Sequence, residues 1–164
     1  MSMWVECTLD ATGWIVSQRT SASMNWQFLR LGGYLYMQNG SGATDVFYGD
    51  YTLALNTRVY VTVTRASTTS WTLYINGSSV STGSRSTSIG TGQTLSLFRT
   101  AESGNNAMHG GVDEFRAIDS TARSANWITA EYNNQNSPST FYSVAAVAGS
   151  SAAQAARRGA VMMM

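Results

Sequence analysis

Short segments in which apolar and polar residues alternate run through most of the chain, and they constrain its fold more than any other feature. In residues 58–65, Val59, Val61 and Val63 alternate with Tyr60 and with polar residues. This period of two is typical of a β-strand with one buried face, so we expect the valines to face the core and Tyr60 to face outward. Similar segments predict the strands 3–8, 14–18, 26–31, 34–38, 46–48, 58–65, 71–75, 78–82, 94–98 and 112–117.

Two dipeptides between these segments predict tight antiparallel hairpins. Gly32-Gly33 and Asn76-Gly77 are residue pairs that adopt the positive φ angles of a primed two-residue turn. Many short strands joined by such turns predict an all-β fold, an antiparallel sandwich of two sheets. One helix is predicted at 125–132, with hydroxyl caps before it and Asn133-Asn134 ending it, exposed and about two turns long. After Pro138 we expect a last extended segment, 139–144.

Composition limits the number of domains and the kinds of partner. The chain has 164 residues, a formal charge of +1 and ten basic residues, all arginine. We therefore expect one domain, 1–144, followed by an Ala-rich tail, 145–164. Near-neutral charge excludes an extended phosphate-binding surface, so no nucleic acid is expected. No apolar run approaches the length of about 18 residues that a membrane span needs, and the first residues lack the basic and apolar regions of a signal peptide. We therefore expect neither a membrane span nor a signal peptide.

Four motifs, in a specific order, resemble the laminin-G-like, concanavalin A-like lectin/glucanase jelly rolls over roughly residues 3–144. The motifs are 61–65, 71–77, 110–116, and 122–128 followed by 131–134. The resemblance implies two packed sheets, a core strand at 112–117 and a short helix packed beneath the sandwich. Members of this family commonly have a further strand before the segment that 3–6 matches. We therefore expect an open edge of the sandwich, or one filled by 141–147 or by another chain.

Catalytic chemistry is not expected. Glycosidases of this superfamily place carboxylates at alternate positions of one strand, about 5 Å apart, whereas Asp113 and Glu114 are adjacent and predicted to point to opposite faces. We expect Asp113 to anchor a loop or the helix, and Glu114 to pair with an arginine such as Arg116. His109 has no second histidine to form a metal site, and Cys7 is predicted to be a buried apolar residue.

A cofactor is not expected either, with calcium as the alternative. Asp45, Asp50 and Asn39 lie near Gly-rich loops and carry the hard oxygen atoms that calcium prefers. Asp and Asn in such loops more often form turns, which is the interpretation we favour.

Aromatic residues supply the candidate binding surface, because several of them face outward by the alternation. Sugars stack their apolar ring faces on aromatic planes, although aromatic residues are also favoured in sheets and protein interfaces. The candidates for contact with a glycan or a partner are Trp26, Tyr34, Tyr36, Tyr48, Tyr51 and Tyr60.

Two hypotheses follow for a non-enzymatic attachment module. The first is a structural or decoration protein on a phage virion, which forms homo-oligomers or binds other subunits through its tail. The tail residues expected to make these contacts are Arg157, Arg158, Met162, Met163 and Met164. The alternative is a carbohydrate-binding domain of a bacterial surface or secreted protein. Both predict a location on a virion surface or outside the cell.

Overall fold

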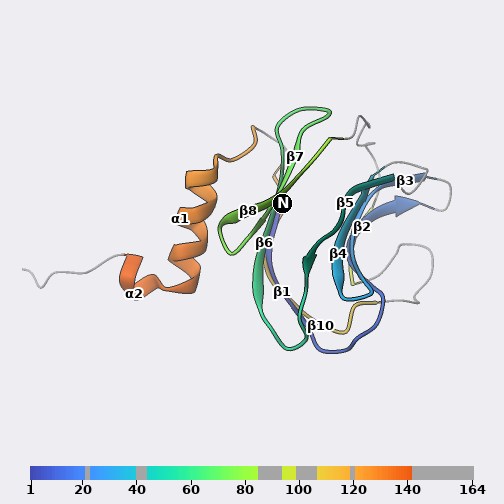
Figure 1. The fold of residues 1–164 in the computed structure, drawn as a ribbon, viewed down its shortest axis with the longest axis horizontal. Coiled ribbons are helices and arrows are strands. Elements are labelled where there is room, and N and C mark those ends of the chain that lie inside the picture. Colours follow the sequence, from blue (N-terminus) through green and yellow to red (C-terminus); the bar gives the residue numbers. More distant parts are fainter. Residues whose placement is uncertain (21–22, 40–43, 85–93, 99–106, 119–120, 142–164) are drawn as a thin grey trace, which may run out of the picture.

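Two antiparallel five-stranded sheets pack face to face in the computed structural model (Figure 1), which describes residues 1–20, 23–39, 44–84, 94–98, 107–118 and 121–141. Sheet A has the strand order β10-β1-β6-β7-β8, and sheet B has the order β5-β4-β3-β2-β9. The strands are β1 (Ser2–Cys7), β2 (Gly13–Thr20), β3 (Ser23–Leu31), β4 (Tyr34–Asn39), β5 (Thr44–Thr52), β6 (Val59–Arg65), β7 (Trp71–Ile75), β8 (Ser78–Gly83), β9 (Leu95–Leu97) and β10 (Gly110–Arg116). The all-β sandwich predicted from the alternation is confirmed, and every predicted strand overlaps one of these.

Both predicted hairpins are present. Gly32 and Gly33 have φ angles of 57° and 91°, and Asn76 and Gly77 have 50° and 80°, as a primed turn requires. The first turn joins β3 to β4 and pairs Leu31 with Tyr34. Because the turn has only two residues, it sets the register of every later pair in this hairpin.

The core lies between the two sheets and is built from the inward-facing residues of both. On β6 the three alternating valines are buried in it, as predicted, and on β4 Leu35 and Met37 face it. Its fully buried members include Met3, Val5, Cys7, Ile15, Val16, Phe28, Leu35, Leu53, Val61 and Leu73. Cys7 is a free, buried cysteine in this core, as expected.

The β10 strand lies at the edge of sheet A, not in its centre. The expectation of a core strand at 112–117 is therefore wrong. Only Val112 and Phe115 of β10 pack against the core, and its other residues are exposed. Among the described strands, β10 pairs with β1 alone.

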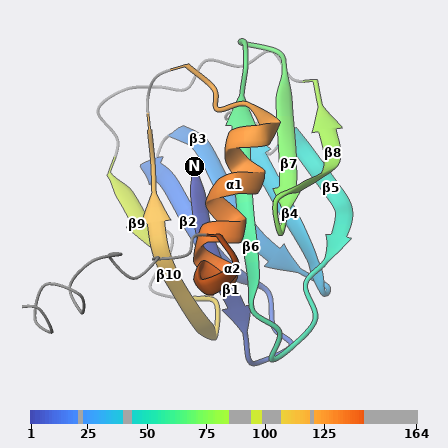
Figure 2. The same cartoon turned by 90° about the vertical axis from the view of Figure 1, so that its left-hand side faces the viewer.

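Helix α1 (Ala125–Asn136) covers the outer face of sheet A (Figure 2). It begins where predicted, with the Ser124 hydroxyl accepting a hydrogen bond from the Trp127 backbone N–H at 3.3 Å. Ile128 is completely buried and the Tyr132 ring contacts Trp4 and Tyr60. The helix is mostly exposed, as predicted, but the predicted end at Asn133-Asn134 is wrong, because asparagine costs only a few tenths of a kcal/mol in a helix and the helix continues to Asn136.

A short helix, α2 (Pro138–Phe141), stands where an extended segment was predicted. Proline is favoured at the first position of a helix, where its missing N–H costs nothing, so Pro138 starts a helix here instead of excluding one. The structure does not describe residues 142–164. These include the rest of that segment, most of the residues 141–147 that were expected to pair with an open sheet edge, and the whole tail 145–164. The tail residues named above, from Arg157 to Met164, are among them. Among the described helices, none has the length and apolar character needed to cross a membrane.

Candidate functional site

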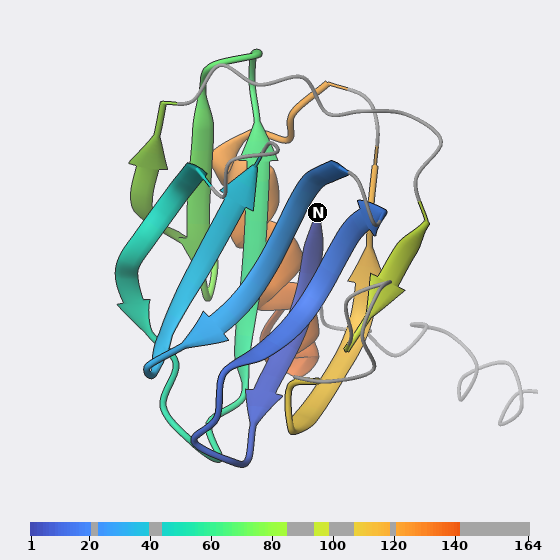
Figure 3. The ribbon, with the colours of Figure 1, turned by 90° about the vertical axis from the view of Figure 1, so that its right-hand side faces the viewer.

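The outer face of sheet B is a broad surface with no described helix or strand in front of it (Figure 3). The corresponding face of sheet A lies beneath α1 (Figure 2). Side chains on β4 alternate between core and surface, so that Leu35 and Met37 face the core while Tyr34, Tyr36 and Gln38 face outward. The outward residues of sheet B therefore form the candidate site.

One row of outward residues crosses four neighbouring strands of sheet B. The register pairs Trp14 of β2 with Leu29 of β3, Leu29 with Tyr36 of β4, and Tyr36 with Tyr48 of β5. Tyr34 lies on the same face of β4 as Tyr36, two residues before it in the strand. The row therefore has an aromatic residue at each end, and its middle is apolar.

The rings at the β5 side of this row are open to solvent. Tyr48 is 66% exposed and Tyr34 is 42% exposed. Tyr36 is buried, and its ring meets Tyr48 edge to face, with centroids 4.7 Å apart and an interplanar angle of 85°. Such edge-to-face pairs are favourable, so Tyr36 supports the exposed ring of Tyr48 from below.

A row of polar residues runs beside the aromatic row. Ser17 pairs with Gln27, and Gln27 pairs with Gln38. The Trp14 indole N–H donates to Gln27 Oε1 at 2.8 Å, and the Gln27 amide nitrogen donates to Gln38 Oε1. Sequence reasoning missed Trp14, Gln27 and Gln38 as site residues. The alternation of Gln27 and Gln38 with Phe28 and Met37 was the signal that could have found them.

Three predicted contact residues do not lie on this open face. Trp26 and Tyr51 are half-buried and pack against the core, and the Trp26 indole N–H donates to Gln18 Oε1 at 2.8 Å. Tyr60 faces outward from sheet A, as predicted, but is 0% exposed because α1 covers it. It is therefore wrong as a contact residue. Of the six candidates, Tyr34, Tyr36 and Tyr48 share one surface.

Burial raises the pKa of the Tyr60 phenol above its ordinary value near 10. The unfolded chain then releases this proton first, so the contribution of Tyr60 is present below pH 10 and is lost as the pH rises toward the raised pKa. We expect the free energy of unfolding to fall by up to about 1.4 kcal/mol per pH unit for this proton above pH 10. Urea unfolding at pH 8 and pH 11 measures this loss. It should be smaller in Tyr60→Phe, and an equal loss in that variant would contradict the assignment.

The carboxylates of β10 form separate ion pairs. Glu114 lies 2.6 Å from Arg116, as predicted, and Arg116 also pairs with Glu131 of α1. Burial alone would lower the pKa of Arg116, but the two carboxylates outweigh it and the pKa is raised. Asp113 pairs with Arg58, the residue before β6, at 2.8 Å. These contacts give both carboxylates structural partners.

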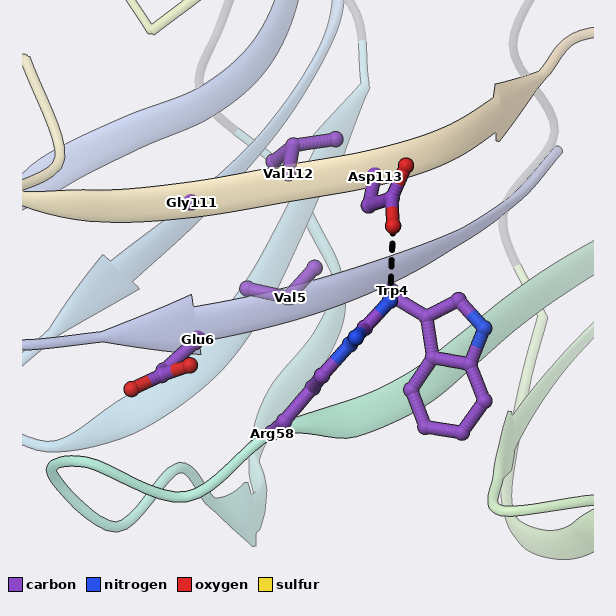
Figure 4. A pocket seen from close by; sticks show the side chains of 7 residues that line it. All are labelled: Trp4, Val5, Glu6, Arg58, Gly111, Val112 and Asp113. Carbon is purple, nitrogen blue, oxygen red and sulfur yellow. Dashed lines mark hydrogen bonds and ion pairs between the residues drawn. The ribbon is translucent and has the colours of Figure 1, made fainter. Parts of the chain in front are cut away.

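A small pocket of about 160 Å³ lies on sheet A beside the Arg58–Asp113 pair (Figure 4). The Arg58 guanidinium stands over the Trp4 ring, 4.8 Å from its centroid. Trp4 is 8% exposed, and its indole N–H donates to Gln135 of α1 at 2.7 Å. The arginine therefore occupies the ring face that a ligand would need, and the pocket offers a ligand little aromatic surface.

Nothing in the described residues assembles a metal site from three or more histidine, cysteine or acidic side chains. Asp50, one of the three calcium candidates, accepts a hydrogen bond from the Ser81 hydroxyl of β8 at 2.8 Å. The side chains of the other two, Asn39 and Asp45, lie outside the description. His109 is exposed.

The fold agrees with the comparison to protein families. Residues 1–129 match the model of the concanavalin A-like lectin/glucanases superfamily. The chain belongs to this superfamily. No curated protein matches the sequence.

Solved structures with the same fold include receptor-binding domains of botulinum neurotoxins. The receptor-binding domain of botulinum neurotoxin D is 15% identical to this chain, with a TM-score of 0.58. The matched region covers 82% of this chain and 36% of the toxin chain. The type G domain is 14% identical, with a TM-score of 0.55, and the match covers 82% of this chain and 37% of the toxin chain. A type C structure is 13% identical, with a TM-score of 0.54, and the match covers 81% of this chain and 35% of the toxin chain. Cell entry of that toxin is reported to depend on interaction with two ganglioside molecules. The chain spans about a third of each structure, and at this identity the likeness shows the fold.

Proposed function

We propose that this protein is a carbohydrate-binding module whose site is the outer face of sheet B. The observation that carries the proposal is the row with the half-buried ring of Trp14 at one end and the exposed ring of Tyr48 at the other, lying beside the amides of Gln27 and Gln38. A sugar ring has apolar C–H faces, which stack on aromatic rings, and hydroxyl groups, which pair with amides. Apolar surface with a few placed polar groups is the usual composition of a small-ligand site.

The dimensions of the row favour an oligosaccharide over a single sugar. Trp14 and Tyr48 are separated by three inter-strand steps, which span roughly 14 Å at about 4.8 Å per step. This is longer than one sugar ring. The toxin domains of the same fold bind receptors, and the type C toxin interacts with gangliosides, which supports glycans as the ligand class.

Binding without hydrolysis is the activity that the described carboxylates support. Retaining and inverting glycosidases need two carboxyl groups on either side of one bond. Most of the described carboxylates instead have an ion-pair or hydrogen-bond partner: Asp10 pairs with Arg30, Asp50 with Ser81, Asp113 with Arg58, and Glu114 and Glu131 with Arg116, while Glu6 lines the pocket on sheet A.

An array of neutral and sialylated oligosaccharides, followed by calorimetric titration of those that bind, tests the proposal. We expect Tyr48→Ala to weaken binding at least about tenfold, the loss typical of an important aromatic contact. Trp127→Ala is the matched control, because Trp127 is 38% exposed but lies on α1, across the molecule. A chelator should leave the affinity unchanged.

Two results would contradict the proposal. One is a wild-type protein that binds no oligosaccharide on the array. The other is equal weakening by Tyr48→Ala and Trp127→Ala, which would place the ligand elsewhere or indicate a general loss of stability.

The hypothesis of a decoration protein on a virion stays a prediction. Its contacts were expected from residues 145–164, which lie outside the described residues. The geometry of sheet B favours the carbohydrate-binding function over it.

A further inference from the structure

The hydrogen bonds among Trp14, Gln27 and Gln38 have only one possible direction. An indole N–H donates and never accepts, so the oxygen of the Gln27 amide must face Trp14. The nitrogen of that amide then faces Gln38, whose oxygen accepts from it. The orientation of both amides therefore follows from the tryptophan, without the usual ambiguity between amide oxygen and nitrogen.

We call the three hydrogen-bonded side chains of Trp14, Gln27 and Gln38 the relay. Gln27 lies in its middle and is nearly inaccessible to solvent. It is 5% exposed, whereas Trp14 and Gln38 on either side are half-buried. A ligand on the face would touch the two outer members and not Gln27. The buried amide also has a strong reason to keep both bonds, because an unpaired buried polar group is costly.

We propose that Gln27 is a positioning residue for ligand binding, and this inference rests on the proposed function. Its amide locks the indole ring of Trp14 and the amide of Gln38 into one rigid unit across β2, β3 and β4. The ligand then meets a stacking ring and a polar group whose relative placement is already set, so less conformational freedom is lost on binding.

The chain contains a matched control for this relay. Trp26 donates its indole N–H to Gln18 Oε1 at 2.8 Å, the same length and chemistry as the Trp14–Gln27 bond, and joins the same two strands. The Trp26 ring packs against the core instead of the open face. Gln18→Leu therefore breaks an equivalent bond away from the proposed site.

The test compares Gln27→Leu with Gln18→Leu in the full chain. Proton–nitrogen NMR resolves the indole N–H groups of the five tryptophans, and the signal missing in Trp14→Phe identifies Trp14. We expect Gln27→Leu to shift that signal and speed its hydrogen exchange, while Gln18→Leu leaves it unchanged. Titration with lactose, cellotriose and a ganglioside head-group oligosaccharide should show at least about fivefold weaker binding for Gln27→Leu alone.

Each outcome decides one claim. An unchanged Trp14 signal in Gln27→Leu overturns the relay, and equal affinity losses in the two leucine variants overturn the positioning role. If the wild-type protein binds none of these saccharides and none on the array, the proposed function fails and the positioning role with it. A shifted Trp14 signal would then show only that the relay exists.

Discussion

Replacing Gly110 with alanine should destabilise the protein by about 3–5 kcal/mol, among the largest effects expected of a single methyl group. A Cβ built on Gly110 would lie 1.9 Å from the backbone oxygen of Glu6 and 3.0 Å from the Cα of Cys7. The obstacle is the backbone of the neighbouring strand β1, which cannot rotate away as a side chain could. Gly110 also has a φ of +150°, which strains any residue with a side chain. The variant must therefore break part of the β1–β10 pairing.

Urea unfolding followed by circular dichroism measures this loss. The next residue supplies the control, because a Cβ on Gly111 would meet no atom within 4 Å. Both glycines lie in β10 and both variants add one methyl group, so Gly111→Ala should change the stability by no more than about 0.5 kcal/mol. Similar losses of unfolding free energy in the two variants would contradict the close approach of Gly110 to β1.

The sequence predicted the strands well because burial of one face imposes a period of two on each of them. It could not predict what lies over the other face. Tyr60 and Tyr36 both face outward by the same alternation, yet Tyr60 is buried against Tyr132 of α1, and Tyr36 is buried with its ring edge to face against Tyr48. Coverage depends on where a distant helix packs, and the period of a strand carries no information about that.

The candidate site was predictable on one side only. The two-residue turn at Gly32-Gly33 sets the register of β3 and β4, so the pairing of Gln27 with Gln38 follows from the sequence. The pairing of β2 with β3 contains two register shifts, between Trp14 and Val16 and between Gln18 and Arg19. Such irregularities displace side chains from simple alternation, which is why Trp14 could not be placed beside Gln27 in advance.

The same limit applies to Asp113 and Glu114. We predicted opposite faces for them from regular alternation. In the structure Ser2 pairs with Arg116 and Trp4 with Asp113, so β10 has one extra residue at this point. Glu114 has a φ of +51° in this bulge. Both carboxylates thereby reach arginines, Asp113 reaching Arg58 and Glu114 reaching Arg116.

Replacing Gly77 with alanine should cost about 2–4 kcal/mol, because this turn residue supports helix α1 as well as the β7–β8 hairpin. A Cβ on Gly77 would lie 3.2 Å from the Cα of Thr129 and 3.2 Å from the Cβ of Tyr132. The Gly77 carbonyl also accepts a hydrogen bond from the Thr129 hydroxyl at 2.8 Å. Alanine would push the helix away from sheet A and weaken that bond. We expect lower stability and faster amide hydrogen exchange in 125–136.

Gly32→Ala separates the two causes of this loss. Gly32 also lies in a two-residue hairpin turn with a positive φ, +57° compared with +80° for Gly77, but a Cβ there meets nothing within 4 Å. Its variant should lose only the conformational part, about 1–2 kcal/mol, and leave exchange in α1 unchanged. If the two variants lost equal stability and exchange in α1 stayed slow in both, the helix would not depend on the hairpin.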